Sequence, residues 1–223
     1  MTIATPPTTS QPSVTQPYQN AAEWVHALGD IPLERIVMNP WPGTATEQDL
    51  LTFAERDKRL CELIDGTLVE KPVGYDECYI AGLLLTHINI FLFANKLGKA
   101  TGEAGFIRMK NGRVRAPDLT FVRRERSLAL PKPTPQVPLV GPDLVVEVLS
   151  PSNTKGEIDQ KLREFFESGS RLAWVINPRT RMVDVYHSAS APTKTLDETG
   201  VLEGEDVLPG FSLPFAKLFE ETI

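Results

Sequence analysis

The chain has 223 residues, of which 41% are hydrophobic and 23% charged, a composition that suits one globular domain with appendages. The formal net charge of −6 argues against a generic nucleic-acid binder. No apolar run approaches the ~20 residues of a membrane span, and the N-terminus has no signal-peptide pattern, so we expect a cytoplasmic protein without a membrane partner. Cys61 and Cys78 are too few for a disulfide framework and are expected to be buried or half-buried thiols.

The N-terminal 60 residues are expected to form a tail followed by a short helical extension. Residues 1–20 hold four prolines among Thr, Ser and Gln, which predicts a disordered tail. Short helices are expected over 21–28 and over 46–57, where Thr46 is an N-cap and acidic residues occupy the first turn. Residues 21–60 are therefore interpreted as an N-terminal helical extension.

The segment from residue 61 to about 98 predicts a hairpin followed by a long helix. Apolar runs at 61–64 and 68–70 flank Asp65 and Gly66, a combination typical of a tight β-turn. An apolar-rich segment at 77–96 predicts a well-buried helix, with Gly98 as its stop.

The remaining elements complete an α/β pattern. Strands are expected near 103–110, 114–122, 143–149, 172–176 and 182–186. A proline-rich loop at 130–142 and a helix at 154–168 that stops at Gly169 lie between them, and the apolar side chains between 211 and 219 should pack onto the core. This order predicts a mixed β-sheet flanked by helices, in one domain over 61–223.

Two acidic residues interrupt strands that are otherwise apolar on both faces, which indicates a sheet covered on both sides. These are Asp118, before Leu-Thr-Phe-Val, and Glu147, between Leu-Val-Val and Val-Leu. An ionised carboxylate in such a place is costly, and two close together disfavour each other's ionisation unless a cation lies between them. A divalent ion, Mg²⁺ or Mn²⁺, is the simplest compensation, so we predict a metal at Asp118 and Glu147. The alternative is structural: a strand-end acid at 118 and a lysine-paired buried acid at 147.

A lysine in the following helix could complete this site. Lys161 lies three residues after Ile158, at the edge of an apolar stripe that includes Leu162 and Phe165. Its ammonium could point at a metal-bound water or at a phosphate. The alternative is a lysine whose head reaches solvent, and Lys155 is a weaker candidate for the same role.

The order of Pro-Asp118, Glu147 and a lysine resembles that of the metal-dependent PD-(D/E)XK nucleases. With Glu62 before Leu-Ile-Asp-Gly, and with Glu147 opening Glu-Val-Leu-Ser-Pro-Ser, the chain is similar to the Uma-two family of restriction-endonuclease-like proteins over about 46–220. The resemblance implies a restriction-endonuclease-like core and an Mg²⁺- or Mn²⁺-dependent endonuclease that hydrolyses phosphodiester bonds in DNA. Its catalytic residues would be Asp118, Glu147, Lys161 and Glu62, the last a third acid that binds metal directly or through water.

The chain departs from the family pattern at several positions. Leu149 stands where the strict motif has its lysine, so the resemblance assigns that role to the helix. Residues common in the family are also replaced at four further positions: Glu157, Phe165, Ala173 and Asn177. Glu77 is an alternative to Glu62 as the third acid.

Basic residues gather between 96 and 126, where nine Lys and Arg face three Asp and Glu. This asymmetry favours a nucleic-acid contact near the Asp118 strand, and we predict that Arg123, Arg124 and Arg126 bind phosphates. The alternative is that these side chains only solvate strands and turns.

Two other classes of function stay open. One is a catalytically weak nucleic-acid-binding or protein-interaction module that retains the nuclease fold, and the other is a structural α/β domain of a protein complex. A homodimer is possible, and the sequence does not distinguish DNA from RNA. The scattered histidines have no zinc-site spacing, and no Gly-rich phosphate loop is present.

Overall fold

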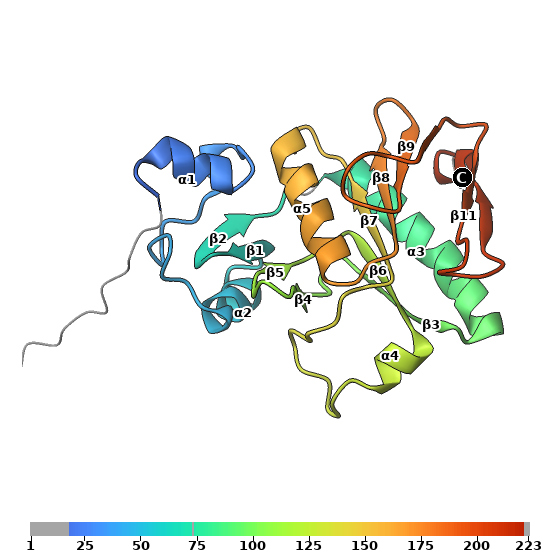
Figure 1. Ribbon diagram of the computed structural model, residues 1–223, viewed down its shortest axis with the longest axis horizontal. Coiled ribbons are helices and arrows are strands. Elements are labelled where there is room, and N and C mark those ends of the chain that lie inside the picture. The colour runs from blue at the N-terminus through green and yellow to red at the C-terminus, as the bar shows by residue number, and fades with distance from the viewer. Residues whose placement is uncertain (1–17, 73, 221–223) are drawn as a thin grey trace, which may run out of the picture.

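A six-stranded mixed sheet forms the centre of the molecule (Figure 1). The computed structural model describes residues 18–72 and 74–220, so most of the predicted tail lies outside the described residues. The strands, in spatial order, are β10 (Lys194–Leu196), β9 (Met182–Tyr186), β8 (Leu172–Asn177), β7 (Leu144–Val148), β6 (Leu119–Arg123) and β3 (Gly98–Gly102). β7 and β8 are parallel and the other neighbours are antiparallel. The predicted mixed sheet is confirmed.

Helices cover this sheet on both faces, which explains why its central strands β7 and β8 are mostly apolar. Successive side chains of a strand point to opposite faces. Val146 and Trp174 therefore join the core cluster under α3 (Tyr75–Asn95), whereas Val145 joins the cluster under α5 (Lys155–Glu167). Figure 1 shows these two helices on either side of the strands.

Helix α3 corrects several expectations. With 21 residues and a mean hydropathy of 1.5, it is long and apolar enough to cross a membrane by length and composition alone, and 28% of its most apolar stretch is buried. Ile80, Leu84 and Ile88 pack on the sheet, but Ile90 and Phe93 are exposed, so the expected well-buried helix is wrong in its burial. Its end is also earlier than expected, because Lys96 adopts a left-handed conformation at the C-cap. Gly98 instead begins β3, where a Cβ atom would collide with the carbonyl oxygen of Val122.

A second, four-stranded sheet lies beside the first, in the order β2 (Thr67–Glu70), β1 (Cys61–Ile64), β5 (Val114–Arg115) and β4 (Ile107–Arg108). The β1–β2 hairpin is confirmed, with Asp65 and Gly66 both at positive φ. The continuous strands expected at 103–110 and 114–122 are wrong. The chain leaves the small sheet after β5 and enters the large one at β6, and Pro117, which lacks an N–H group, lies in the crossing.

The N-terminal segment packs against the β1–β2 hairpin. It contains α1 (Ala21–Ala27), η1 (Leu33–Arg35) and α2 (Glu47–Arg56), and Thr46 forms the predicted N-cap as part of a capping box. Ile36 bridges to Val69 of β2, and both belong to a small buried cluster.

The C-terminal region forms β11 (Val201–Glu203), β12 (Ser212–Pro214) and η2 (Phe215–Leu218). Phe211 and Phe215 enter the cluster beneath α3, as expected from their apolar spacing. α4 (Arg124–Leu128), after β6, was not expected. Cys61 is buried, but Cys78 is exposed, so the expectation that both thiols are at least half-buried is wrong for Cys78.

Candidate active site

The two predicted acids meet at one end of the central strands. β6 and β7 are antiparallel with Leu119 opposite Val146, and the same register continued by one residue sets Asp118 opposite Glu147. Asp118 precedes β6 and accepts a hydrogen bond at Oδ2 from the backbone N–H of Val148, at 2.5 Å. The register therefore brings the two predicted acids to neighbouring positions at the same edge of the sheet.

Lys161 projects from α5 into the same place. Its side chain is 1% exposed, and Nζ lies 3.1 Å from Glu147 Oε2 and 3.2 Å from Glu62 Oε1. The alternative of a lysine whose head reaches solvent is thus excluded in this structure. The burial follows from the helix periodicity, because Ile158, Leu162 and Phe165 pack on the sheet from the same face of α5.

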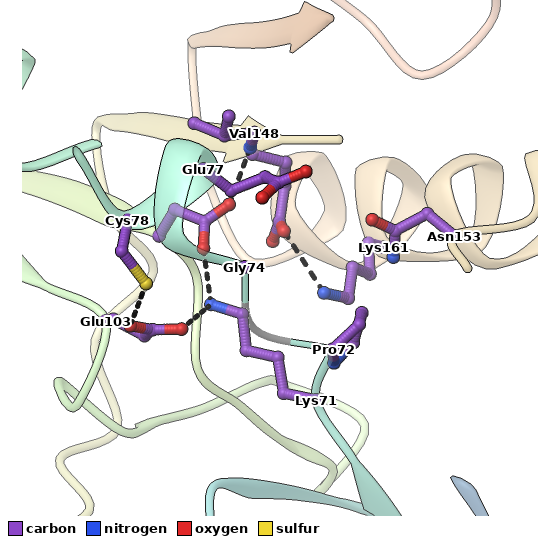
Figure 2. Close-up of a pocket in the computed structure, with 11 residues that line it drawn as sticks. Lys71, Pro72, Gly74, Glu77, Cys78, Glu103, Val148, Asn153 and Lys161 are labelled. Carbon is purple, nitrogen blue, oxygen red and sulfur yellow. Dashed lines mark hydrogen bonds and ion pairs between the residues drawn. The ribbon is translucent and has the colours of Figure 1, made fainter. Parts of the chain in front are cut away.

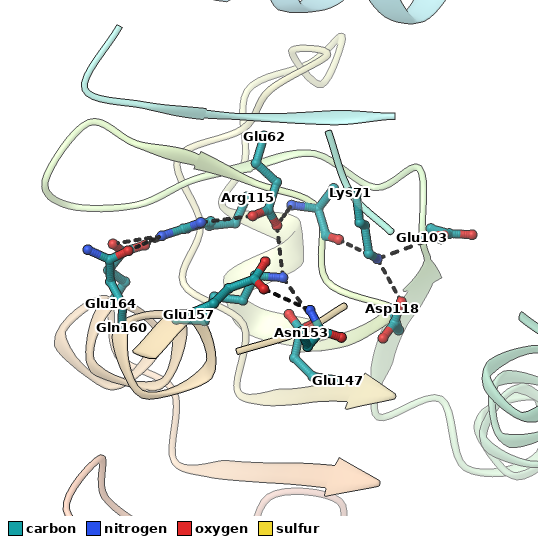
Figure 3. Close-up of polar contacts among 12 residues, drawn as sticks. Glu62, Lys71, Glu103, Arg115, Asp118, Glu147, Asn153, Glu157, Gln160 and Glu164 are labelled. Atoms are coloured by element: carbon teal, nitrogen blue, oxygen red, sulfur yellow. Dashed lines mark hydrogen bonds and ion pairs between the residues drawn. The ribbon is translucent and has the colours of Figure 1, made fainter. Parts of the chain in front are cut away.

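Glu62 is a fully paired buried anion. Besides Lys161, it accepts hydrogen bonds from Arg115 Nη1 at 2.8 Å and from the backbone N–H of Ala116 at 3.1 Å (Figure 3). Burial alone would raise the pKa of Glu62, but the cations of Lys161 and Arg115 outweigh it and hold the pKa well below the usual range. Glu62 therefore fixes the position of Lys161 from the side opposite Glu147.

Glu147 is the acid whose charge is least compensated. Burial, with a further contribution from Asp118, outweighs the attraction of Lys161 and raises the pKa of Glu147 to about 7. Within the described part of the chain, Glu147 Oε1 is buried without a hydrogen-bond partner. A buried oxygen without a partner requires an explanation, and a bound cation or water is the usual one.

Lys71, which the sequence reasoning missed, is a second lysine at the site. It follows β2, and its Nζ lies 2.6 Å from Asp118 Oδ1, 2.7 Å from the carbonyl oxygen of Ala116 and 3.7 Å from Glu103 Oε1. Burial lowers its pKa, but the carboxylates of Asp118 and Glu147 outweigh this effect and raise the pKa overall. No local pattern marks Lys71, because its acidic partner is 47 positions away.

A cavity of about 10 Å³, roughly the room of one water molecule, lies between these groups. Figure 2 shows the side chains around it, from both sheets and from α3 and α5. The charged residues that line it are Lys71, Glu77, Glu103, Asp118, Glu147 and Lys161. Glu77, the alternative third acid, thus faces the cavity, whereas Glu62 is not among its lining residues.

The donor set fits a small divalent ion held by two carboxylates. Among the described residues, no group of three or more His, Cys, Asp and Glu side chains is arranged to hold a metal. Mg²⁺, however, commonly takes one or two carboxylates and keeps several waters or substrate oxygens. Asp118 and Glu147, with the unpaired Oε1 of Glu147, meet that requirement.

Helix α5 is held in place by buried ion pairs with distant segments. Arg35 Nη2 lies 2.7 Å from Glu157 Oε1, and Arg115 Nε lies 2.6 Å from Glu164 Oε2. Glu157, one of the departures from the family pattern, therefore has a partner in the N-terminal segment. These contacts fix the height and rotation of the helix that carries Lys161.

The other predicted residues lie away from the cavity. Lys155 is exposed at the start of α5 and pairs with Asp159. Arg123, Arg124 and Arg126 lie at or beyond the far end of β6 from Asp118. Arg123 donates to the carbonyl oxygen of Asp206, Arg126 pairs with Asp143 at 2.9 Å, and Arg124 is exposed. The structure does not bring these arginines to the acids, and their contact with phosphates stays a prediction.

Comparisons with known proteins agree with this architecture. A family model described as "Uma2: Putative restriction endonuclease" matches residues 47–216. A crystal structure of "a putative nuclease" from Anabaena variabilis superposes with a TM-score of 0.64 at 19% sequence identity, over 73% of this chain and 90% of that one. At this identity the likeness shows a shared fold. No curated protein matches the chain significantly.

Proposed function

This chain belongs to the Uma2 family, and on that premise we propose that it is a metal-dependent endonuclease that hydrolyses phosphodiester bonds in DNA. The observation that carries the proposal is the pairing of Asp118 with Glu147 beside a small polar cavity, with Glu147 Oε1 buried and unpaired among the described residues. A cation bound in the cavity would give that oxygen a partner.

Each residue has a distinct task in this proposal. Asp118 and Glu147 would hold Mg²⁺ or Mn²⁺. When bound, the ion supplies a water of lowered pKa and neutralises charge on the phosphate. Lys161 lines the cavity and would act on the attacking water or on a phosphate oxygen. Glu62 keeps Lys161 in position, because it anchors Nζ from the side of the small sheet.

A catalytically weak nucleic-acid-binding module is the second candidate. Two observations favour it: Lys71 already pairs with Asp118, and the described residues contain no three-ligand metal cluster. The possible homodimer and the cytoplasmic location stay predictions. Light scattering of the purified protein at several concentrations would test the first of these.

Metal titration combined with cleavage distinguishes the two candidates. Isothermal titration of the wild-type protein with Mn²⁺ should show binding that Asp118→Asn abolishes, and only the wild type should cleave plasmid or single-stranded DNA. Asp159→Asn is a matched control, since Asp159 is a partly exposed acid of α5 that pairs with Lys155. Equal Mn²⁺ binding by the wild type and Asp118→Asn would refute the site. Metal binding without cleavage would favour the weak module.

A further inference from the structure

Lys71 has no part in the roles proposed above, although it contacts one of the metal-holding acids. Its backbone N–H donates to the carbonyl oxygen of Leu60 at 2.8 Å, which anchors the residue just after the hairpin. Its side chain is buried to 4% exposure and ends between Asp118 and Glu103 (Figure 3). A buried ammonium is costly to keep unless it has a partner, so its contact with Asp118 stabilises both groups.

Asp118 Oδ1 is the oxygen at which Lys71 and a metal ion would compete. Oδ2 is held by the backbone N–H of Val148, so a metal ion that takes the place of the lysine would bind at Oδ1. Lys71 Nζ lies 2.6 Å from Oδ1. A Mg²⁺ ion bound to Oδ1 would lie at about 2.0–2.1 Å from that oxygen. The ion and the ammonium would then be close neighbours in a buried site, and like charges repel strongly there.

Glu103 is the acceptor to which the ammonium can move. Its Oε1 is 3.7 Å from Lys71 Nζ, beyond a hydrogen bond but within an ion pair, and its side chain is 29% exposed. The carbonyl oxygen of Ala116, at 2.7 Å from Nζ, can remain bound during a small shift of the lysine tip. A rotation about the last side-chain bonds of Lys71 would therefore move its ammonium from the carboxylate of Asp118 to that of Glu103.

We propose that the Lys71 ammonium is the resident counter-ion of Asp118 in the metal-free protein, and that a divalent ion displaces it from Asp118 Oδ1 towards Glu103. The proposal rests on the metal site of the proposed function. Lys71 then lowers the affinity for the metal, because its contact with Asp118 must be given up. Glu103 raises that affinity, because it receives the displaced charge.

A double-mutant cycle read by Mn²⁺ titration tests the displacement. Lys71→Met should bind Mn²⁺ at least about fivefold more tightly than the wild type, on the scale of an ordinary coupling between sites. Glu103→Gln should weaken binding in the wild-type background and have no effect in the Lys71→Met background. Lys155→Met removes the same charge from an exposed position and should leave the affinity unchanged.

Two results would overturn the proposal. If Glu103→Gln weakens binding equally in both backgrounds, Glu103 acts on the metal itself and does not act through Lys71. If Lys71→Met binds Mn²⁺ no better than the wild type, the ammonium does not compete. Absence of Mn²⁺ binding by the wild type would refute the metal site as well. Binding that depends on Asp118 but is indifferent to Lys71 refutes the displacement alone.

Labelling of the wild-type protein provides a test that needs no variant at position 71, should Lys71→Met fail to fold. Mass spectrometry after brief treatment with an amine-reactive acetylating reagent would follow Lys71 with and without saturating Mn²⁺. Labelling of Lys71 should increase with the metal, because the ammonium moves from a buried to a partly exposed carboxylate, while Lys155 labels equally in both states. Labelling of Lys71 that is unchanged or lower with the metal would contradict the displacement.

Discussion

At the scale of single residues, the candidate site is a cluster of buried charges with too little positive charge. Lys161 is shared between Glu62 and Glu147, while Arg115 supports Glu62 alone among these acids. Glu147 consequently keeps the weakest support, and its pKa rises to about 7. A buried carboxylate that shares its cation is costly in the metal-free protein, and a bound cation beside Glu147 would offset that cost.

The pH dependence of stability should reveal this imbalance. Well below pH 4.5 the Glu147 carboxyl is protonated in both the folded and the unfolded protein. Between pH 4.5 and about 7 it ionises in the unfolded chain but stays protonated in the folded protein, so the free energy of unfolding falls as the pH rises through 7. The rise in pKa from 4.5 to about 7 corresponds to about 3 kcal/mol of unfolding free energy. Glu147→Gln should lack this decline. Urea unfolding of the wild type and Glu147→Gln in EDTA at pH 5 and pH 8 measures this loss of unfolding free energy. An equal loss in the two proteins would show that the pKa of Glu147 is not raised by burial.

Lys161 should be required for cleavage but not for metal binding. Lys161→Met keeps much of the buried volume and removes the ammonium that lines the cavity, so the cleavage rate should fall at least about 100-fold. Mn²⁺ titration should still show binding, because Asp118 and Glu147 are intact. Lys155→Met, at the exposed start of α5, should cleave like the wild type. Near-normal cleavage by Lys161→Met would show that Lys161 is not the catalytic lysine.

At the scale of elements, the position of α5 decides where Lys161 points. The helix begins at Thr154, whose hydroxyl accepts the N–H of Glu157, and ends before Gly169 at a φ of 106°. Its buried side carries Glu157 and Glu164 as well as apolar residues, and each of these acids pairs with an arginine from elsewhere in the chain. The helix is thus fixed by charge pairs in addition to its apolar stripe.

The Arg35–Glu157 pair should therefore be worth far more than an exposed pair. Arg35→Gln leaves Glu157 buried without its cation, which typically costs about 3 kcal/mol or more. Arg59→Gln breaks the exposed contact with Glu70 and should cost at most about 1 kcal/mol. Denaturant unfolding at neutral pH compares the two variants. Similar losses would mean that the N-terminal segment does not fix α5.

At the scale of the whole molecule, the cavity beside Asp118 and the three arginines Arg123, Arg124 and Arg126 lie at opposite ends of β6. A five-residue strand spans roughly 17 Å, about the length of five base pairs, so a duplex bound as proposed would have to extend over at least that length to meet both places. Arg123 and Arg126 already have partners in Asp206 and Asp143, which leaves the exposed Arg124 as the side chain most able to meet a phosphate.

The salt dependence of DNA binding should reflect that difference. Each lost phosphate contact lowers the slope of log affinity against log salt by roughly one. Arg124→Ser by itself should lower the slope by roughly one. The triple variant that also carries Arg123→Ser and Arg126→Ser should have nearly the same slope as Arg124→Ser. Binding of a short duplex in Ca²⁺ at several salt concentrations measures it, with Mn²⁺ affinity as the control. A slope that does not change in the triple variant would show that these arginines are an ordinary solvated turn.

The sequence by itself determined those features that depend on neighbours along the chain. Alternating and continuous apolar runs predicted the central strands, Asp65-Gly66 predicted the hairpin, and Thr46 predicted a helix start. The acids at 118 and 147 were conspicuous because they interrupt apolar strands, and Lys161 because it falls in a helical stripe. Each signal has a short period or a fixed local spacing.

Only the tertiary structure decided which charges meet. Lys71 and Asp118 are 47 positions apart, and Arg35 and Glu157 are 122 apart, so no local spacing relates them. The crossing at Pro117, which divides an expected strand, depends on the chain passing between two sheets. The buried contacts also determine how well each acid is compensated. Glu62 contacts two cations, Lys161 and Arg115. Glu147 shares Lys161 with Glu62, and one of its oxygens has no hydrogen-bond partner among the described residues.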